Sequence, residues 1–134
     1  MFEIIGEDRL INMRIADALE KLSRNNPQWL NTHKLKILRL LSTYQEKEFL
    51  WHLVQMCTWV KWSKTEIKIV TTLLSNFLTY KNQSRIVRVS SLQALFELSM
   101  ESSYIKSKLH LLANEILHEN VPSLNARLKK LRLV

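Results

Sequence analysis

Three stretches of the chain repeat one pattern of apolar residues at a constant distance of 38 residues. Within each stretch the apolar residues lie three and four positions apart, so we expect them to form the core-facing side of a helix. A unit of this length holds two helices, and such pairs bury their apolar stripes by stacking on one another. The equivalent positions are Ile11, Phe49 and Val87; Ile15, Leu53 and Ser91; Ala16, Val54 and Leu92; Ala18, Met56 and Ala94; Leu19, Cys57 and Leu95; and Leu22, Val60 and Leu98.

The end of the chain joins the series with a step one residue shorter, because residues 11–15 (INMRI) reappear as residues 124–128 (LNARL). The composition favours helices as well. The chain has one glycine and two prolines in 134 residues, whereas a β-rich fold of this size needs many turns that glycine supplies. With 46% hydrophobic residues, it is too apolar for general disorder. We predict an all-α protein with a single domain over residues 1–134.

Start and stop signals divide the chain into about seven predicted helices. Asp8 is the predicted N-cap of the first, and Ser63 with Glu66 has the S-x-x-E form of a capping box. Pro27 and Pro122 suit the first turns of two further helices. The predicted helices cover residues 8–24, 27 or 32 to 43, 46–59, 64–80, 84–100, 102 or 103 to 119, and 122 onward.

Residues 87–98 (VRVSSLQALFEL) resemble the second helix of a HEAT repeat, whose pattern is V-R-x-x-A-x-x-A-L-x-x-L. Residues 13–22 (MRIADALEKL) resemble it too, and residues 48–53 (EFLWHL) belong to the middle copy. The chain is similar over most of its length to small bacterial HEAT-like proteins. This resemblance implies an armadillo-like fold: a right-handed α-α superhelix, here of about seven helices with a period of about 38 residues.

The resemblance also implies a place for a partner, because HEAT-like proteins usually bind along the concave surface made by the second helices of the pairs. Tryptophan and arginine often anchor such interfaces. An alternative stays open for Trp51 and Trp59, which instead fill the seam between helix pairs or shield the turn before Ser63. The candidate partner-binding residues are Arg14, Asp17, Trp51, His52, Gln55, Trp59, Gln93 and Arg127.

The net charge of +8 is unevenly distributed, with an acidic beginning and a basic surplus between Lys61 and Arg88 and in the tail. Such a surplus is typical of nucleic-acid-binding proteins and equally of an ordinary solvated lysine surface. HEAT-like alkylpurine DNA glycosylases are similar basic solenoids, and Asp17 beside Trp51 resembles their carboxylate and aromatic residues, although no motif matches. Nucleic-acid binding is therefore the alternative function. Its candidate residues are Lys61, Lys64, Lys68, Lys81, Arg85, Arg88, Lys129 and Lys130.

No pattern in the sequence predicts catalysis. His110 and His118 share a helical face, but about 12 Å along the helix axis separates them, which is too far for one metal ion. The single cysteine, Cys57, lies in an apolar run and is expected to be a buried thiol. We therefore expect no catalytic residue, no metal site and no cofactor.

The first predicted helix looks like the second member of a pair whose first member is missing, and Phe2–Ile5 is too short to replace it. Because terminal repeats need capping, we expect a monomer with an exposed end, or a dimer through this uncapped N-terminal end. The uncharged runs are too short to span a bilayer, and the N-terminus is acidic where a signal peptide is basic. The sequence thus predicts a cytoplasmic, non-catalytic protein-interaction module that binds a protein partner and no membrane.

Overall fold

In the computed structural model, which describes residues 9–43 and 45–134, eight helices account for all regular secondary structure of the described residues. The sequence pattern predicts about seven, because it indicates one helix from residue 27 or 32 to residue 43. A turn at Thr32 and His33 divides it in two, where the N–H of His33 donates to the carbonyl oxygen of Leu30 at 2.9 Å. The helices are α1 (Arg9–Asn25), α2 (Pro27–Asn31), α3 (Lys34–Thr43), α4 (Lys47–Cys57), α5 (Lys64–Thr79), α6 (Arg85–Ser99), α7 (Ser103–Leu117) and α8 (Pro122–Lys130).

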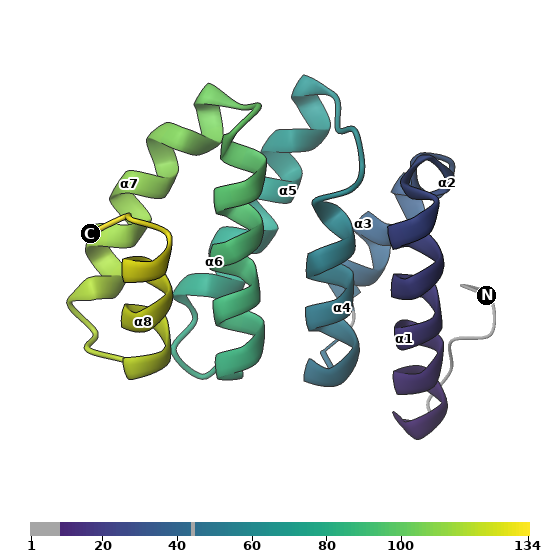
Figure 1. Ribbon diagram of the computed structural model, residues 1–134, viewed down its shortest axis with the longest axis horizontal. Coiled ribbons are helices and arrows are strands. Elements are labelled where there is room, and N and C mark those ends of the chain that lie inside the picture. The colour runs from purple at the N-terminus through teal and green to yellow at the C-terminus, as the bar shows by residue number, and fades with distance from the viewer. Residues whose placement is uncertain (1–8, 44) are drawn as a thin grey trace.

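The helices form two layers (Figure 1). Helices α1, α4, α6 and α8 stand side by side in what we call the front layer, and α3, α5 and α7 form the back layer behind them. From α3 onward each connection runs from one layer to the other, so successive helices alternate between the layers, whereas α1 leads to α3 through the short helix α2. The α4–α5 and α6–α7 connections lie at one edge of the layers, at the top of Figure 1, and the α5–α6 turn lies at the opposite edge.

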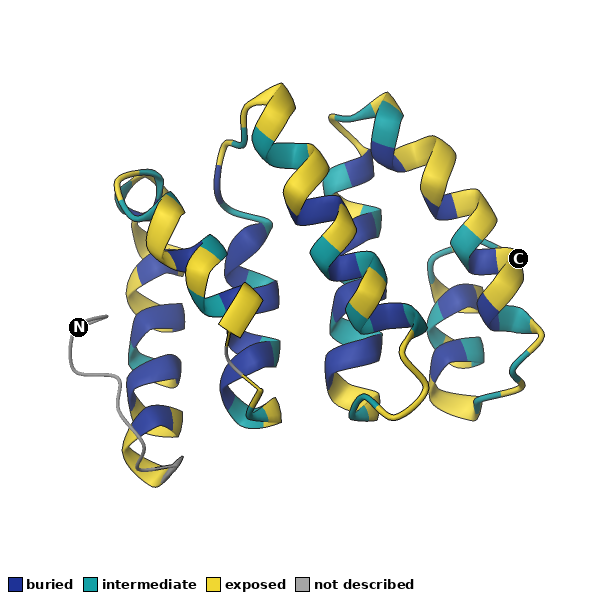
Figure 2. Cartoon of the chain, turned by 180° about the vertical axis from the view of Figure 1, so that it is seen from behind, coloured by how far each residue is buried: buried dark blue, intermediate teal, exposed yellow. Residues whose placement is uncertain are grey.

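The core lies between the layers, and three of the six sets of equivalent positions in the 38-residue repeat are buried in all three copies. Leu19, Cys57 and Leu95 are each 0% exposed. Figure 2, seen from the back layer, shows how buried and exposed residues alternate around each helix. The side chains that the repeat places toward the core in α4 and α6 are all buried or half-buried, as expected for amphipathic helices that share one core.

Helix α1 departs from the predicted burial. Ile11 and Leu22 were expected to face the core but are 52% and 47% exposed, whereas their equivalents Phe49 and Val60 are buried. The reason is position, because α1 ends the front layer and packs against α4 on one side only. The uncapped end and the oligomeric state stay predictions. The predicted N-cap Asp8 and the segment Phe2–Ile5 lie outside the described residues.

The predicted capping box at the start of α5 is confirmed. The backbone N–H of Glu66 donates to the hydroxyl oxygen of Ser63 at 3.1 Å, and the N–H of Ser63 donates to the Glu66 carboxylate at 2.8 Å. Lys34 in α3 also donates to this carboxylate, at 3.0 Å. The hydrogen bond from Ser63, followed by the one from Lys34, holds the pKa of Glu66 below its ordinary value. One carboxylate therefore stabilises the helix start and ties it to the neighbouring helix of the back layer.

Replacement of this carboxylate tests the pKa shift. We expect Glu66→Gln to lower the free energy of unfolding at pH 7 by up to about 1 kcal/mol, because glutamine still caps but loses the ion pair. A group whose pKa is lowered by folding contributes stability above its unfolded pKa and loses it as the pH falls through the folded pKa. The deficit should therefore vanish in acid. Urea unfolding at pH 7 and in acid measures this loss of stability, with Glu101→Gln as the exposed control. A loss that is equally large in acid would contradict the lowered pKa of Glu66.

The shared core predicts a second contrast. Leu95→Ala removes a fully buried side chain in the centre of the front layer and should lower the free energy of unfolding by about 2–5 kcal/mol. The matched control is Leu111→Ala in α7, where the side chain is 73% exposed, and it should change stability by less than about 0.5 kcal/mol. Equal losses in urea unfolding would show that α6 is not the centre of the core.

Candidate functional site

The outward face of the front layer is hollowed in two places, on either side of α4. The α1–α4 hollow has a volume of about 460 Å³ and the α4–α6 hollow about 110 Å³. The first is lined by Met13, Asp17, Glu20, Lys21, Arg24, Glu48, Trp51 and His52, and the second by Gln55, Thr58, Val89, Ser90, Gln93, Ala94, Glu97 and Arg127. Six of the eight candidate partner-binding residues therefore line these hollows. The other two, Arg14 and Trp59, lie outside both linings.

A buried pair of polar side chains forms the floor of the α1–α4 hollow. The carboxylate of Glu20 in α1 contacts Nδ1 of His52 in α4, and Nη2 of Arg24 donates to the same carboxylate at 3.0 Å. Glu20 is 6% and His52 is 8% exposed. His52 thus points toward α1 rather than outward, which differs from its predicted surface position. The carboxylate of Glu20, 32 residues away in the chain, draws the imidazole inward.

The tryptophans of the middle repeat have different surroundings. The ring of Trp51 is half-buried and stacks on the imidazole of His52, with 3.7 Å between ring centroids. The guanidinium of Arg24 lies 5.8 Å from the centroid of the half-buried Trp59 ring. Trp62 donates its indole N–H to the carbonyl oxygen of Cys57 at 2.9 Å and so secures the connection after α4. Of these three rings, only that of Trp51 lines a front-layer hollow.

The α4–α6 hollow contains a chain of side-chain hydrogen bonds. Nη1 of Arg127 in α8 donates to Oε1 of Gln93 in α6 at 2.8 Å. The amide nitrogen of Gln93 in turn donates to the carboxylate of Glu97 at 3.0 Å. Arg127 is therefore connected through an amide to an opposite charge one turn along α6. This network links neighbouring helices and holds polar groups at fixed positions in the hollow.

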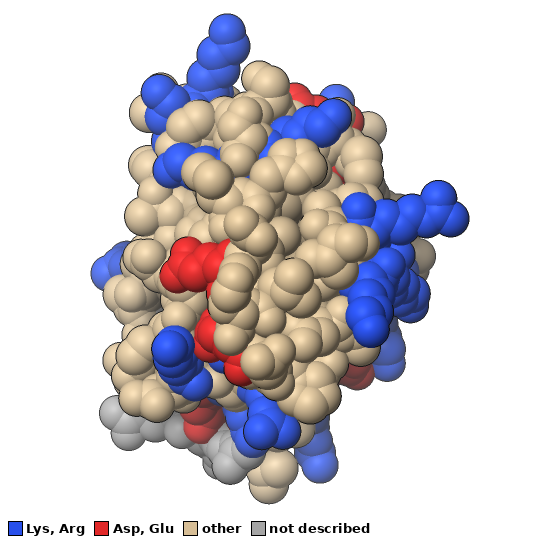
Figure 3. Space-filling model, turned by 90° about the vertical axis from the view of Figure 1, so that its left-hand side faces the viewer, with Lys and Arg blue, Asp and Glu red and all other residues tan. Residues whose placement is uncertain are grey.

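The eight candidate basic residues do not form one patch. Lys61, Lys64 and Lys68 are exposed near the start of α5, whereas Lys81 and Arg85 are exposed at the α5–α6 turn on the opposite edge. The exposed Lys129 and Lys130 end α8. Figure 3, which shows the face at the α7–α8 end, has Lys and Arg side chains in separate places around a largely uncharged centre.

Arg88 differs from the other basic candidates because it is inside the protein. It is 3% exposed; its Nε donates to the carbonyl oxygen of Leu78 at 2.7 Å, and its Nη2 donates to the Glu119 carboxylate at 2.7 Å. The guanidinium thereby joins the end of α5 and the segment after α7 to the start of α6. It is not a surface cation, so we remove it from the nucleic-acid candidates.

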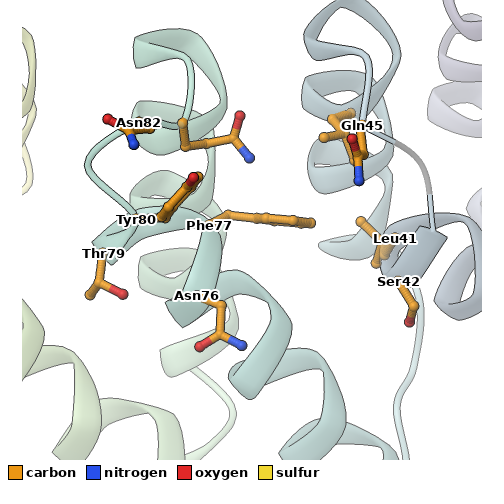
Figure 4. A pocket seen from close by; sticks show the side chains of 10 residues that line it. Leu41, Ser42, Gln45, Asn76, Phe77, Thr79, Tyr80 and Asn82 are labelled. Carbon is orange, nitrogen blue, oxygen red and sulfur yellow. The ribbon is translucent and has the colours of Figure 1, made fainter.

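A further hollow, with a volume of about 730 Å³, lies between the end of α3 and the α5–α6 turn (Figure 4). The ring of Phe77 projects across it toward Gln45 and Leu41, with Tyr80 beside Phe77. Its lining contains amides, hydroxyls and rings, with no charged residue: Leu41, Ser42, Gln45, Leu50, Asn76, Phe77, Thr79, Tyr80, Asn82 and Gln83. The sequence did not predict this hollow, because its lining combines residues of α3, α4 and α5 with residues of two connections, which no periodic pattern relates.

The remaining reactive side chains have simple surroundings. Cys57 is fully buried, and burial raises the pKa of its thiol far above the usual range, so the thiol stays protonated. His110 is exposed on α7, and Nδ1 of His118 lies 2.7 Å from the carbonyl oxygen of Asn114. Within residues 9–43 and 45–134, no three His, Cys, Asp or Glu side chains gather as a metal site would require.

Comparison with models of protein families, with curated proteins and with solved structures finds no match to this chain. The HEAT-like arrangement therefore stays a prediction from the sequence. Among the helices of the described residues, none has the length and apolar character needed to cross a membrane.

The buried guanidinium generates a testable contrast within one helix. Arg88→Gln should lower the free energy of unfolding by about 3 kcal/mol, because it leaves Glu119 and the carbonyl of Leu78 without their partner. Arg85→Gln, three residues earlier on the exposed side of α6, should change it by less than about 0.5 kcal/mol. Urea unfolding compares the two variants. A tolerated Arg88→Gln would mean that the guanidinium does not hold these three elements together.

Proposed function

We propose that this protein is a non-catalytic, HEAT-like interaction module that binds a protein partner across the outward face of its front layer. The observation that carries the proposal is the position of Trp51. It is half-buried and lines the α1–α4 hollow, on the helix that separates the two hollows. Aromatic side chains in such half-buried positions contribute disproportionately to interface energy. The partner would lie across α4, with contacts in the hollows on both sides.

The HEAT-like, right-handed superhelix is part of this proposal. Two observations support it: the stacking of helices into two layers and the burial of three sets of equivalent positions, such as Leu19, Cys57 and Leu95, in all three copies of the 38-residue repeat. Stacked helix pairs form long, continuous faces that suit partner binding. We place the module in the cytoplasm, where a thiol such as that of Cys57 stays reduced.

The charges of the front layer bear on how it would recognise a partner. Lys21 pairs with Asp17 at 3.0 Å, and Arg24 pairs with Glu20 at the same distance. Because these ions already have partners within the protein, a ligand gains little by bringing an opposite charge. Recognition would therefore depend on shape, on the ring of Trp51 and on a few fixed polar groups. Binding of this kind depends weakly on salt.

Partner capture with matched variants tests the proposal. A protein retained by the wild type at high salt should be lost by Trp51→Ala and kept by Ile69→Ala, whose side chain is 48% exposed on α5 in the back layer. We expect the loss of Trp51 to weaken binding at least about thirtyfold, the effect of a hot-spot residue. Isothermal titration with the identified partner measures the change.

A second variant separates binding from folding, because Trp51 also stacks on His52. Gln55→Lys introduces a charge at the rim of the α4–α6 hollow without removing packing, and circular dichroism should show it fully folded. It should also lose the partner. If Trp51→Ala, Gln55→Lys and Ile69→Ala all retain the same proteins as the wild type, the front layer is not the binding surface.

A further inference from the structure

A fourth hollow lies at the edge where α4 passes into α5 and α6 passes into α7, away from the two front-layer hollows. Its volume is about 650 Å³, which suits a small molecule or a single nucleotide unit. Its lining combines basic, aromatic and apolar side chains: Val60, Lys61, Trp62, Ser63, Lys64, Ile67, Lys68, Leu98, Glu101, Ser102, Ser103 and Tyr104. We call it the edge hollow.

The edge hollow carries a local excess of positive charge. Lys61, Lys64 and Lys68 line it and are exposed. In the part of the chain that the structure describes, no carboxylate pairs with these three ammonium groups. The one carboxylate in the lining is that of Glu101, while Glu66 nearby is already engaged by Ser63 and Lys34. An anion entering the hollow would meet unpaired cations, in contrast to the paired ions of the front layer.

Aromatic rings lie directly beside these cations. Trp62 and Tyr104 are half-buried in the lining. The ammonium of Lys68 lies 5.8 Å from the centroid of the Tyr104 ring, and that of Lys108, which the sequence did not single out, lies 4.7 Å from it. The attraction between cation and ring holds both lysines near the hollow. A flat apolar surface and several phosphate-binding groups are therefore within reach of one ligand.

We infer that the edge hollow binds single-stranded nucleic acid, a role beyond the proposed protein-binding surface. Single strands are recognised by aromatic rings that stack on unpaired bases, next to cations that follow the phosphates. The apolar residues Val60, Ile67 and Leu98 line the same hollow, which suits a base better than a solvated carboxylate side chain. A duplex keeps its bases paired and stacked, so none of its bases is free to enter the edge hollow.

The inference gives the basic surplus of the sequence a definite location. It retains Lys61, Lys64 and Lys68, which line the hollow, whereas Lys108 contacts the Tyr104 ring without lining the hollow. The other exposed candidates lie elsewhere: Lys81 and Arg85 at the opposite edge, and Lys129 and Lys130 at the end of α8. This separation supplies a matched control, because two cations can be removed at either edge with the same change in net charge.

Fluorescence anisotropy with labelled oligothymidylate and oligouridylate tests the site, with probes of about 12 nucleotides. With three phosphate contacts, the Kd of the wild type should rise roughly twentyfold between about 50 and about 200 mM NaCl. Lys64→Gln/Lys68→Gln leaves one contact, so the rise should shrink to about threefold, and the Kd at low salt should increase at least about tenfold. Lys81→Gln/Arg85→Gln should change the Kd less than about twofold.

The stacking part of the inference has its own variant. Tyr104→Leu should raise the Kd by about fivefold or more, because it removes both the ring and the attraction that holds Lys68 near the hollow. If this variant fails to fold by circular dichroism, the two double variants still decide the location of binding. Trp51→Ala should leave the Kd for oligonucleotides unchanged, so failure of the protein-binding proposal and failure of this one are distinguishable.

Several results would overturn the inference. One is the absence of binding to either oligonucleotide at low salt. Another is an equal loss of affinity in the two double variants, which would indicate attraction by net charge alone. Tighter binding of a duplex of equal length, or displacement of the oligonucleotide by polyglutamate at equal charge concentration, would assign the hollow to a different anionic ligand.

Discussion

The burial of one repeated apolar stripe between two layers is the constraint on which the rest of this structure depends. An isolated helix of the front layer leaves its stripe in water, and the free energy gained by burying it appears only when neighbours stack. Helix α6 shows the result most fully, because it packs against α4, α5, α7 and α8. Helix α1 shows the opposite case, since it has a single neighbour in its layer and keeps Ile11 and Leu22 exposed.

Two buried charged groups interrupt this apolar core, and both connect separate helices. Glu20 joins α1 to His52 of α4, and Arg88 joins the start of α6 to Leu78 and Glu119. Buried ion pairs are weak evidence for stability, because the cost of desolvating the charges offsets much of their attraction. Their geometry is directional, however, whereas apolar stripes of similar shape are interchangeable. These contacts therefore restrict which helices become neighbours and in what register, a choice that the repeated stripe alone leaves open.

The sequence predicted the parts of the structure that depend on periodicity. The all-α composition, the capping box at Ser63 and the shared burial of Leu19, Cys57 and Leu95 follow from local spacing.

The sequence did not predict contacts between residues that are distant in the chain. The pattern placed Arg88 at the start of a helix, but its carboxylate partner is 31 residues away, and no spacing relates them. The same holds for His52 and Glu20, and for the hollow around Phe77, whose lining combines three helices and two connections.

For ligand binding, the position and pairing of each cation matter more than the net charge of the chain. The cations of residues 9–43 and 45–134 include some with a partner inside the protein, such as Arg88 and Arg127, and some with no ion-pair partner among these residues, such as Lys64. A paired cation has already exchanged water for a protein oxygen, so a ligand gains little by approaching it, whereas an exposed lysine keeps its full attraction for phosphate.

The surface therefore has two regions with different chemistry. The front layer offers shape and fixed polar groups, and the edge hollow offers free charge beside aromatic rings. Because charge attraction is screened by ions and apolar contact is not, one small fold presents two surfaces whose affinities respond differently to the same ionic strength.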